Sequence, residues 1–257
     1  MEFKWLIDTN ILIDFIIGLV NTLYFQKYLE KKVETFKTED VLNAIKAILN
    51  NLCNVEIIVT EKIKNEFRRV LRRHEGLLRR RNVEYRKLLE GIEGIVRNSC
   101  VKYQVLDTRP LEENMAKKLR ELRIHCDPKD LHIIVAVNLK KPTTVFTDED
   151  AVKSAVREFL WKTGRQTIAL HGFAGFLDSL EVINAISREE RLLIGYCAYK
   201  FQRLRYSHEI VFELGQQKRR RELNLWVKYA EERFQRYLPI KVMFRFFKTS
   251  RTGVLPK

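Results

Sequence analysis

Cysteine, histidine, glycine and proline are all scarce in this chain of 257 residues. The four cysteines lie far apart without a CxxC pair, and no HExxH motif is present, which excludes the usual structural and catalytic zinc sites. Scattered cysteines also offer no disulfide framework, so we expect a reducing, cytoplasmic compartment. The ten glycines and five prolines exclude a collagen-like or proline-rich chain.

The sequence also lacks an uninterrupted hydrophobic run of the length that crosses a membrane. Its most apolar segment, residues 5–25, contains Asp8 and Asp14. An aspartate at the centre of a membrane helix costs roughly 2.5–3.5 kcal/mol. We therefore expect no signal peptide, no anchor and no membrane-spanning segment.

Positive charge is what the sequence has in excess. Lysine and arginine number 48 against 33 acidic residues, which gives a net charge of +15. A balance of this size favours a polyanionic partner, either nucleic acid or an acidic membrane surface. Because 46% of the residues are hydrophobic, the chain can also bury a full core.

Strand-like and helix-like segments alternate along residues 3–182. Short apolar segments predict strands over residues 3–8, 55–59, 101–106, 143–146 and 167–170. Helical patterns are found over residues 11–29, 38–51, 61–98, 111–123, 128–140 and 150–162. Strands separated by helices predict an α/β fold with a central parallel sheet of about five strands and helices on both faces.

Residues 183–257 lack this alternation and carry 17 lysines and arginines against seven acids. Helices are predicted there over 188–205, opened by a capping box at Ser187, and over 209–236. We therefore divide the chain into a domain of residues 1–182 and a basic helical C-terminal extension. The apolar sides of these helices need covering, and a homodimer would provide this.

Acidic side chains gather at the predicted carboxyl ends of the strands, where open parallel sheets bind ligands. They are Asp8 after the first strand, Glu66 after the second, Asp130 before the fourth, and Asp148 and Glu149 after the fourth. Carboxylates at one edge repel each other unless cations bind there. Without a cysteine or histidine cluster, oxygen ligands favour Mg²⁺ or Mn²⁺, which can activate water for displacement at a phosphodiester.

Four short motifs, in this order, resemble those of PIN-domain nucleases. Residues 5–13 (WLIDTNILI) are similar to the opening of these nucleases, in which the first strand ends in an Asp-Thr-Asn turn. Residues 63–67 (IKNEF), 130–136 (DLHIIVA) and 145–149 (VFTDE) resemble the segments that carry the second, third and fourth acids. The resemblance covers residues 3–180 and implies a three-layer PIN-like fold with metal-dependent nuclease activity.

The resemblance implies that Asp8, Glu66 and Asp130 bind Mg²⁺ or Mn²⁺, and it leaves two residues open for the fourth acid. The family usually has Thr, any residue and then Asp in the last motif, which places Glu149 in the ligand position. Asp148 would take this position if the turn were shifted. Three polar neighbours are expected to orient the carboxylates through hydrogen bonds: Thr9, Asn10 and Thr147.

Two basic clusters are candidates for phosphate binding. Residues 62–87 contain 11 lysines and arginines but three acids, fewer than an ion-paired helix carries. The candidate contacts to nucleic acid are Arg68, Arg69, Arg72, Arg73, Arg79, Arg80 and Arg81, and in the extension Lys218, Arg219, Arg220 and Arg221. The alternative for both clusters is a solvated helix face without a ligand.

Together these features predict a metal-dependent endoribonuclease that uses water as the nucleophile and prefers RNA to DNA. The resemblance implies a toxin of a toxin–antitoxin pair, an RNA-processing or decay enzyme, or a nuclease that acts on DNA. The basic extension favours a dedicated substrate or partner surface over a bare toxin domain, and it leaves a protein inhibitor or complex partner open. The alternative is a non-catalytic RNA- or DNA-binding or assembly subunit, which the altered last motif favours.

Overall fold

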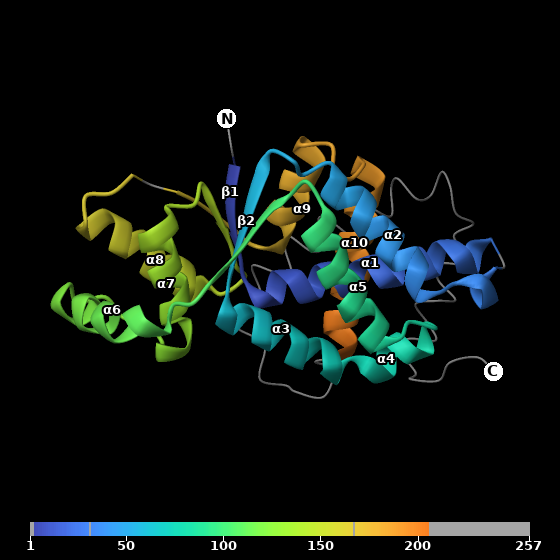
Figure 1. Ribbon diagram of the computed structural model, residues 1–257, viewed down its shortest axis with the longest axis horizontal. Helices are drawn as coiled ribbons and strands as arrows, with labels where there is room; N and C mark the ends of the chain where they lie inside the picture. Colours follow the sequence, from blue (N-terminus) through green and yellow to red (C-terminus); the bar gives the residue numbers. More distant parts are fainter. Residues whose placement is uncertain (1–2, 31, 167, 206–257) are drawn as a thin grey trace.

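A five-stranded parallel sheet lies at the centre of the protein, as the computed structural model shows for residues 3–30, 32–166 and 168–205 (Figure 1). The strands are β1 (Phe3–Ile7), β2 (Val55–Thr60), β3 (Lys102–Leu106), β4 (Thr144–Phe146) and β5 (Ala169–His171). Their order across the sheet is β3-β2-β1-β4-β5, and every neighbouring pair is parallel. The predicted α/β fold with a parallel sheet is therefore confirmed.

Helices cover both faces of this sheet (Figure 1). One face carries α6 (Arg109–Glu121), η2 (Pro128–Asp130), α7 (Leu131–Lys140) and α8 (Asp150–Lys162). The other side carries α1 (Thr9–Leu29), η1 (Val33–Thr35), α2 (Thr38–Asn50), α3 (Glu61–Arg73), α4 (Glu75–Arg80), α5 (Tyr85–Asn98), α9 (Phe173–Val182) and α10 (Arg188–Arg205). Each face of the sheet has its own hydrophobic core. Because side chains alternate along a strand, Leu6 packs in the core beneath α6, α7 and α8, whereas Trp5 and Ile7 pack in the core on the other face.

The helical sequence predicted over residues 61–98 forms three helices, α3, α4 and α5, rather than one. Asn82 adopts a left-handed backbone with φ of 55°, a conformation that asparagine tolerates better than most residues. The turn lets Leu71, Leu78 and Leu88 all be fully buried on the same side of the sheet. Burial of these three side chains thus outweighs the continuous helical pattern. Helix α9 was also missing from the predicted elements.

The first helix of the predicted C-terminal extension, α10, packs along α1. Gly18 in α1 permits the close approach, since a Cβ atom added there would lie 2.6 Å from the backbone oxygen of Ile194. Ile194 and Ala198 are each 1% exposed and so belong to the interior. The helix predicted over 209–236 lies outside the described residues, as does the cluster formed by Lys218, Arg219, Arg220 and Arg221. The domain boundary after residue 182 stays a prediction.

Cys53 and Cys100 form a disulfide, which corrects the expectation that the cysteines form no such framework. Both residues are exposed, and they precede β2 and β3 at the amino ends of these strands. Their 47-residue separation concealed the pairing, which depends on the alignment of β2 with β3. Because two of the four cysteines are paired, the cysteines no longer support the expectation of a reducing compartment. In the described part of the chain, no helix is long and apolar enough to cross a membrane.

Candidate active site

The carboxyl ends of β1 and β4 meet where the strand order reverses. The chain runs outward from β1 to β2 and β3, and it then returns to place β4 on the other side of β1. Loops leave the two strands in opposite directions at such a point, which is where open α/β sheets bind ligands. Asp8 directly follows β1, and its N–H donates a 2.9 Å hydrogen bond to the carbonyl of Phe146 at the end of β4.

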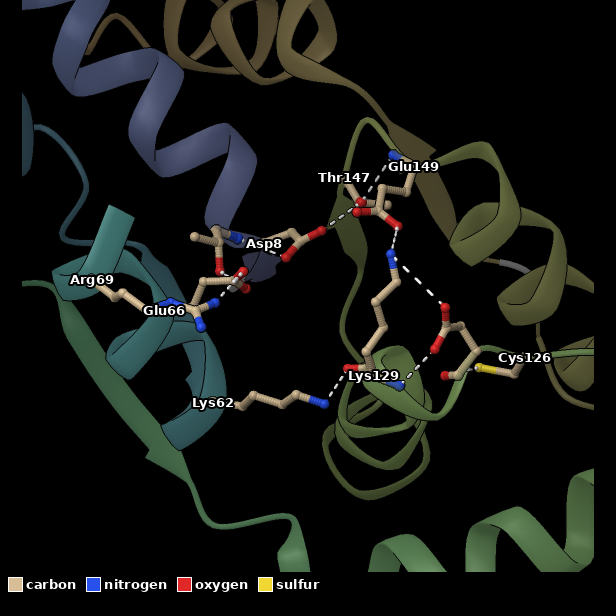
Figure 2. A network of polar contacts seen from close by, with 10 residues as sticks. Asp8, Lys62, Glu66, Arg69, Cys126, Lys129, Thr147 and Glu149 are labelled. Atoms are coloured by element: carbon tan, nitrogen blue, oxygen red, sulfur yellow. Dashed lines mark hydrogen bonds and ion pairs between the residues drawn. The ribbon is translucent and has the colours of Figure 1, made fainter. Parts of the chain in front are cut away.

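Hydrogen bonds hold both carboxylate oxygens of Asp8. Oδ1 accepts from the backbone N–H of Thr9 at 2.6 Å, and Oδ2 accepts from Thr147 Oγ1 at 2.7 Å (Figure 2). Asp8 is 8% exposed, and this burial raises its pKa to about 6 although both hydrogen bonds oppose the shift. A buried carboxylate in this state favours either a proton or a nearby cation.

Glu66 and Glu149 lie close enough to Asp8 for their negative charges to contribute to its raised pKa. Glu66 belongs to α3, and its Oε2 accepts from Thr9 Oγ1 at 3.1 Å. Its Oε1 lies 3.3 Å from Arg69 Nη2 in an ion pair on the same helix. Thr9 therefore bonds both acids, through its N–H to one and through its hydroxyl to the other.

Asp130 is a second buried carboxylate, also 8% exposed. It ends η2, a turn capped by Asp127, whose Oδ1 accepts from the N–H of Lys129 at 2.9 Å. Burial and the nearby charge of Glu149 together raise the pKa of Asp130 to about 6, and the Lys129 ammonium opposes the shift. Glu149 is thus a charged neighbour of both buried acids, Asp8 and Asp130.

Asp148 is engaged at the start of α9. Its Oδ1 accepts from the backbone N–H of Phe173, the first residue of that helix, at 3.0 Å. Gly172 leaves room for this contact, since an added Cβ would lie 2.4 Å from the same oxygen. Of the two residues that the sequence left open, Glu149 is the one beside Asp8. The four acids that the fold brings together are Asp8, Glu66, Asp130 and Glu149.

Two lysines that the sequence analysis did not single out lie among these acids (Figure 2). Lys129 Nζ lies 3.5 Å from Glu149 Oε2 and 4.0 Å from Asp127 Oδ2. The ammonium of Lys62, at the start of α3, donates to the backbone carbonyl of Lys129. Lys62 lies four residues before Glu66, and Lys129 directly precedes Asp130. This closeness along the chain could have identified both lysines, but the sequence analysis considered only the larger arginine clusters.

Buried polar groups also connect the elements around the cluster. Thr9 and Thr147 bond to carboxylates as described, whereas Asn10 Oδ1 is buried with no hydrogen-bond partner among the described residues. His132 Nδ1 lies 2.9 Å from Thr60 Oγ1, and burial lowers the pKa of this histidine to about 4, so the ring is neutral at pH 7. Thr60 also caps α3, and the contact therefore ties α7 to α3.

The arginine-rich cluster contains both paired and exposed members. Three arginines form ion pairs with glutamates: Arg68 with Glu93, Arg69 with Glu66, and Arg79 with Glu75. The Arg81 guanidinium lies 4.2 Å from the centre of the Tyr24 ring. Arg72, Arg73 and Arg80 are exposed, and within residues 3–205 no ion pair is found for them. These three are the members of this cluster best placed to meet a phosphate from outside.

The donor set of the clustered acids fits Mg²⁺ or Mn²⁺, because every donor is a carboxylate oxygen. A divalent cation would also relieve the repulsion that Glu149 exerts on Asp8 and Asp130. Among the described residues, no three His, Cys, Asp or Glu side chains are already close enough to hold an ion.

Comparisons with known proteins give no match, whether with models of protein families, with curated proteins or with solved structures. The resemblance to PIN-domain nucleases rests on the four sequence motifs. The parallel sheet is consistent with it.

Proposed function

We propose that this protein is a metal-dependent endoribonuclease with a PIN-like fold that prefers RNA to DNA. The observation that carries the proposal is the pair of buried acids, Asp8 and Asp130, at the switch point of the sheet with Glu149 beside both. Burying carboxylates next to another carboxylate is unfavourable for folding. Perturbed acids in this arrangement are typical of functional sites, where a ligand compensates for their repulsion.

Each residue of the cluster has a distinct part in this proposal. Asp8, Asp130, Glu66 and Glu149 would hold Mg²⁺ or Mn²⁺ through carboxylate oxygens. The bound ion would supply hydroxide from water near neutral pH and stabilise charge in an in-line displacement at a phosphodiester. Thr147 keeps Asp8 in one orientation by its 2.7 Å hydrogen bond, so that the carboxylate loses less conformational freedom on binding.

The exposed arginines of α3 would position the substrate. Arg73 lies seven residues after Glu66 in the same helix, a spacing that returns to the same face and rises about 10 Å along the axis. Arg73 thus lies on the Glu66 face of α3, at a distance suited to a neighbouring phosphate, and the exposed Arg72 precedes it. Contacts of this kind hold the backbone and carry little sequence information, which favours recognition of RNA by shape.

The test is cleavage of end-labelled single-stranded RNA and DNA in EDTA, Mg²⁺ and Mn²⁺. Asp8→Asn should abolish cutting, because it removes a charged ligand. Asp150→Asn is the matched control, since the Asp150 side chain is 89% exposed at the start of α8 and pairs with Lys153. Metal-dependent cutting by the wild type and by the control, lost in Asp8→Asn, supports the proposal. Cutting that survives in Asp8→Asn or in EDTA contradicts it.

A non-catalytic nucleic-acid-binding subunit is the second candidate, favoured by the ion pair that occupies Glu149. A gel-shift assay of RNA with and without Mn²⁺ separates the two candidates. Equal binding in both conditions, without cleavage, supports the subunit. In either case, the double variant Arg72→Gln with Arg73→Gln should weaken RNA binding. The slope of the logarithm of the binding constant against the logarithm of salt concentration should fall in magnitude by about one to two. Unchanged binding would show that α3 does not contact RNA.

A further inference from the structure

Lys129 extends into the acidic cluster from the turn before α7 (Figure 2). Its Nζ lies 3.5 Å from Glu149 Oε2 and 4.0 Å from Asp127 Oδ2. Its backbone N–H donates to Asp127 Oδ1 at 2.9 Å, and its carbonyl accepts from the ammonium of Lys62. Both polar groups of the backbone are thus engaged, and the point from which the ammonium extends is fixed.

The ammonium pairs with the acid that neighbours both buried carboxylates. Glu149 is the charged neighbour of Asp8 and of Asp130. The positive charge of Lys129 beside Glu149 therefore reduces the repulsion among these three carboxylates, and it does so without a metal ion. A divalent cation that binds the same oxygens would lie close to the ammonium, and two cations at that separation repel each other.

We propose that Lys129 is a built-in cation of the acidic cluster that competes with the divalent ion for Glu149. The inference rests on the proposed metal site. The ammonium pairs with Glu149 in the structure, and it must turn away for Mg²⁺ or Mn²⁺ to bind the same oxygens.

The competition predicts a tighter metal site when the ammonium is removed. Lys129→Met keeps the length of the side chain and leaves the two backbone hydrogen bonds available. Since exposed ion pairs contribute little, the Kd for Mn²⁺ should fall by about two- to fivefold. Lys153→Met is the matched control, because the Lys153 ammonium pairs with Asp150 at 3.3 Å and, among the described residues, forms no ion pair with Glu149 or Asp130. Its loss should leave the Kd for Mn²⁺ unchanged.

A double-mutant cycle separates direct competition from a general change in charge. Mn²⁺ binding is measured by isothermal titration calorimetry at pH 7 with MnCl₂ alone, in the wild type, Lys129→Met, Glu149→Gln and the double variant. If Lys129 acts through Glu149, Lys129→Met gives no further tightening in the Glu149→Gln background. The same fold-change in both backgrounds, or none in the wild type, overturns the inference.

The outcomes also separate this inference from the proposed function. Wild type that binds Mn²⁺, loses the binding in Asp8→Asn and is unaffected by Lys129→Met retains the proposed metal site and overturns the competition. Wild type that binds no Mn²⁺, together with a Lys129→Met variant that binds none, overturns both. Urea unfolding of each variant shows that a changed Kd does not arise from loss of the fold.

Discussion

Asp8→Asn should stabilise the metal-free protein, although it removes a proposed metal ligand. Burial raises the pKa of Asp8 from 3.8 to about 6, so the folded state binds this proton more tightly than the unfolded state. Stability from this group is therefore present below about pH 4 and is lost as the pH rises through 6. A shift of about two units corresponds to roughly 3 kcal/mol. Asparagine carries no charge and escapes this loss.

The hydrogen bonds around Asp8 allow the substitution. The asparagine oxygen can accept from the N–H of Thr9, and the amide can donate to Thr147 Oγ1, because that hydroxyl is free to rotate. Replacing a charged acceptor by neutral groups weakens the two bonds by about 1 kcal/mol in total. At pH 8 the variant should therefore exceed the wild type by about 2 kcal/mol in free energy of unfolding.

The assay is urea unfolding in EDTA at pH values from 4 to 8. The difference between Asp8→Asn and the wild type cancels the titration of all other groups, and it should grow by roughly 3 kcal/mol across this range. Asp150→Asn, on an exposed side chain, should show a small and nearly constant difference. A pH-independent difference for Asp8→Asn would refute the argument that burial destabilises this carboxylate.

Three further predictions concern the disulfide, the last acid and the packing of α10. Cys53→Ser with Cys100→Ser should lower the free energy of unfolding in urea by about 4 kcal/mol for this 47-residue loop, without changing Mn²⁺ affinity, because the bond lies at the amino ends of the strands. Glu149→Gln should weaken Mn²⁺ binding in calorimetry by about tenfold, whereas Asp148→Asn should preserve it; equal losses would contradict the placement of Asp148 at α9. Gly18→Ala should destabilise the protein by about 1–3 kcal/mol in thermal unfolding, because its methyl group would meet a backbone oxygen of α10; an unchanged Tm would contradict that contact.

The architecture followed from local patterns. Apolar strands that alternate with helical segments specified a parallel sheet, because such strands must be joined by crossovers that cover its faces. The same patterns placed Asp8 and Glu149 after strands and Asp130 at a helix start, so their shared edge could be inferred without coordinates. Thr147 was expected to orient a carboxylate for the same reason.

Contacts between distant parts of the chain set the remaining features. Asp148 meets the start of α9, 25 residues further on, and this contact leaves Glu149 beside the buried acids. Arg68 is paired by Glu93 only because the segment after α3 folds back, which the continuous charge run concealed. The Cys53–Cys100 bond and the position of Lys129 on Glu149 likewise depend on aligned strands and packed helices. Sequence patterns report the periodicity of one element, whereas such pairings arise when separate elements pack together.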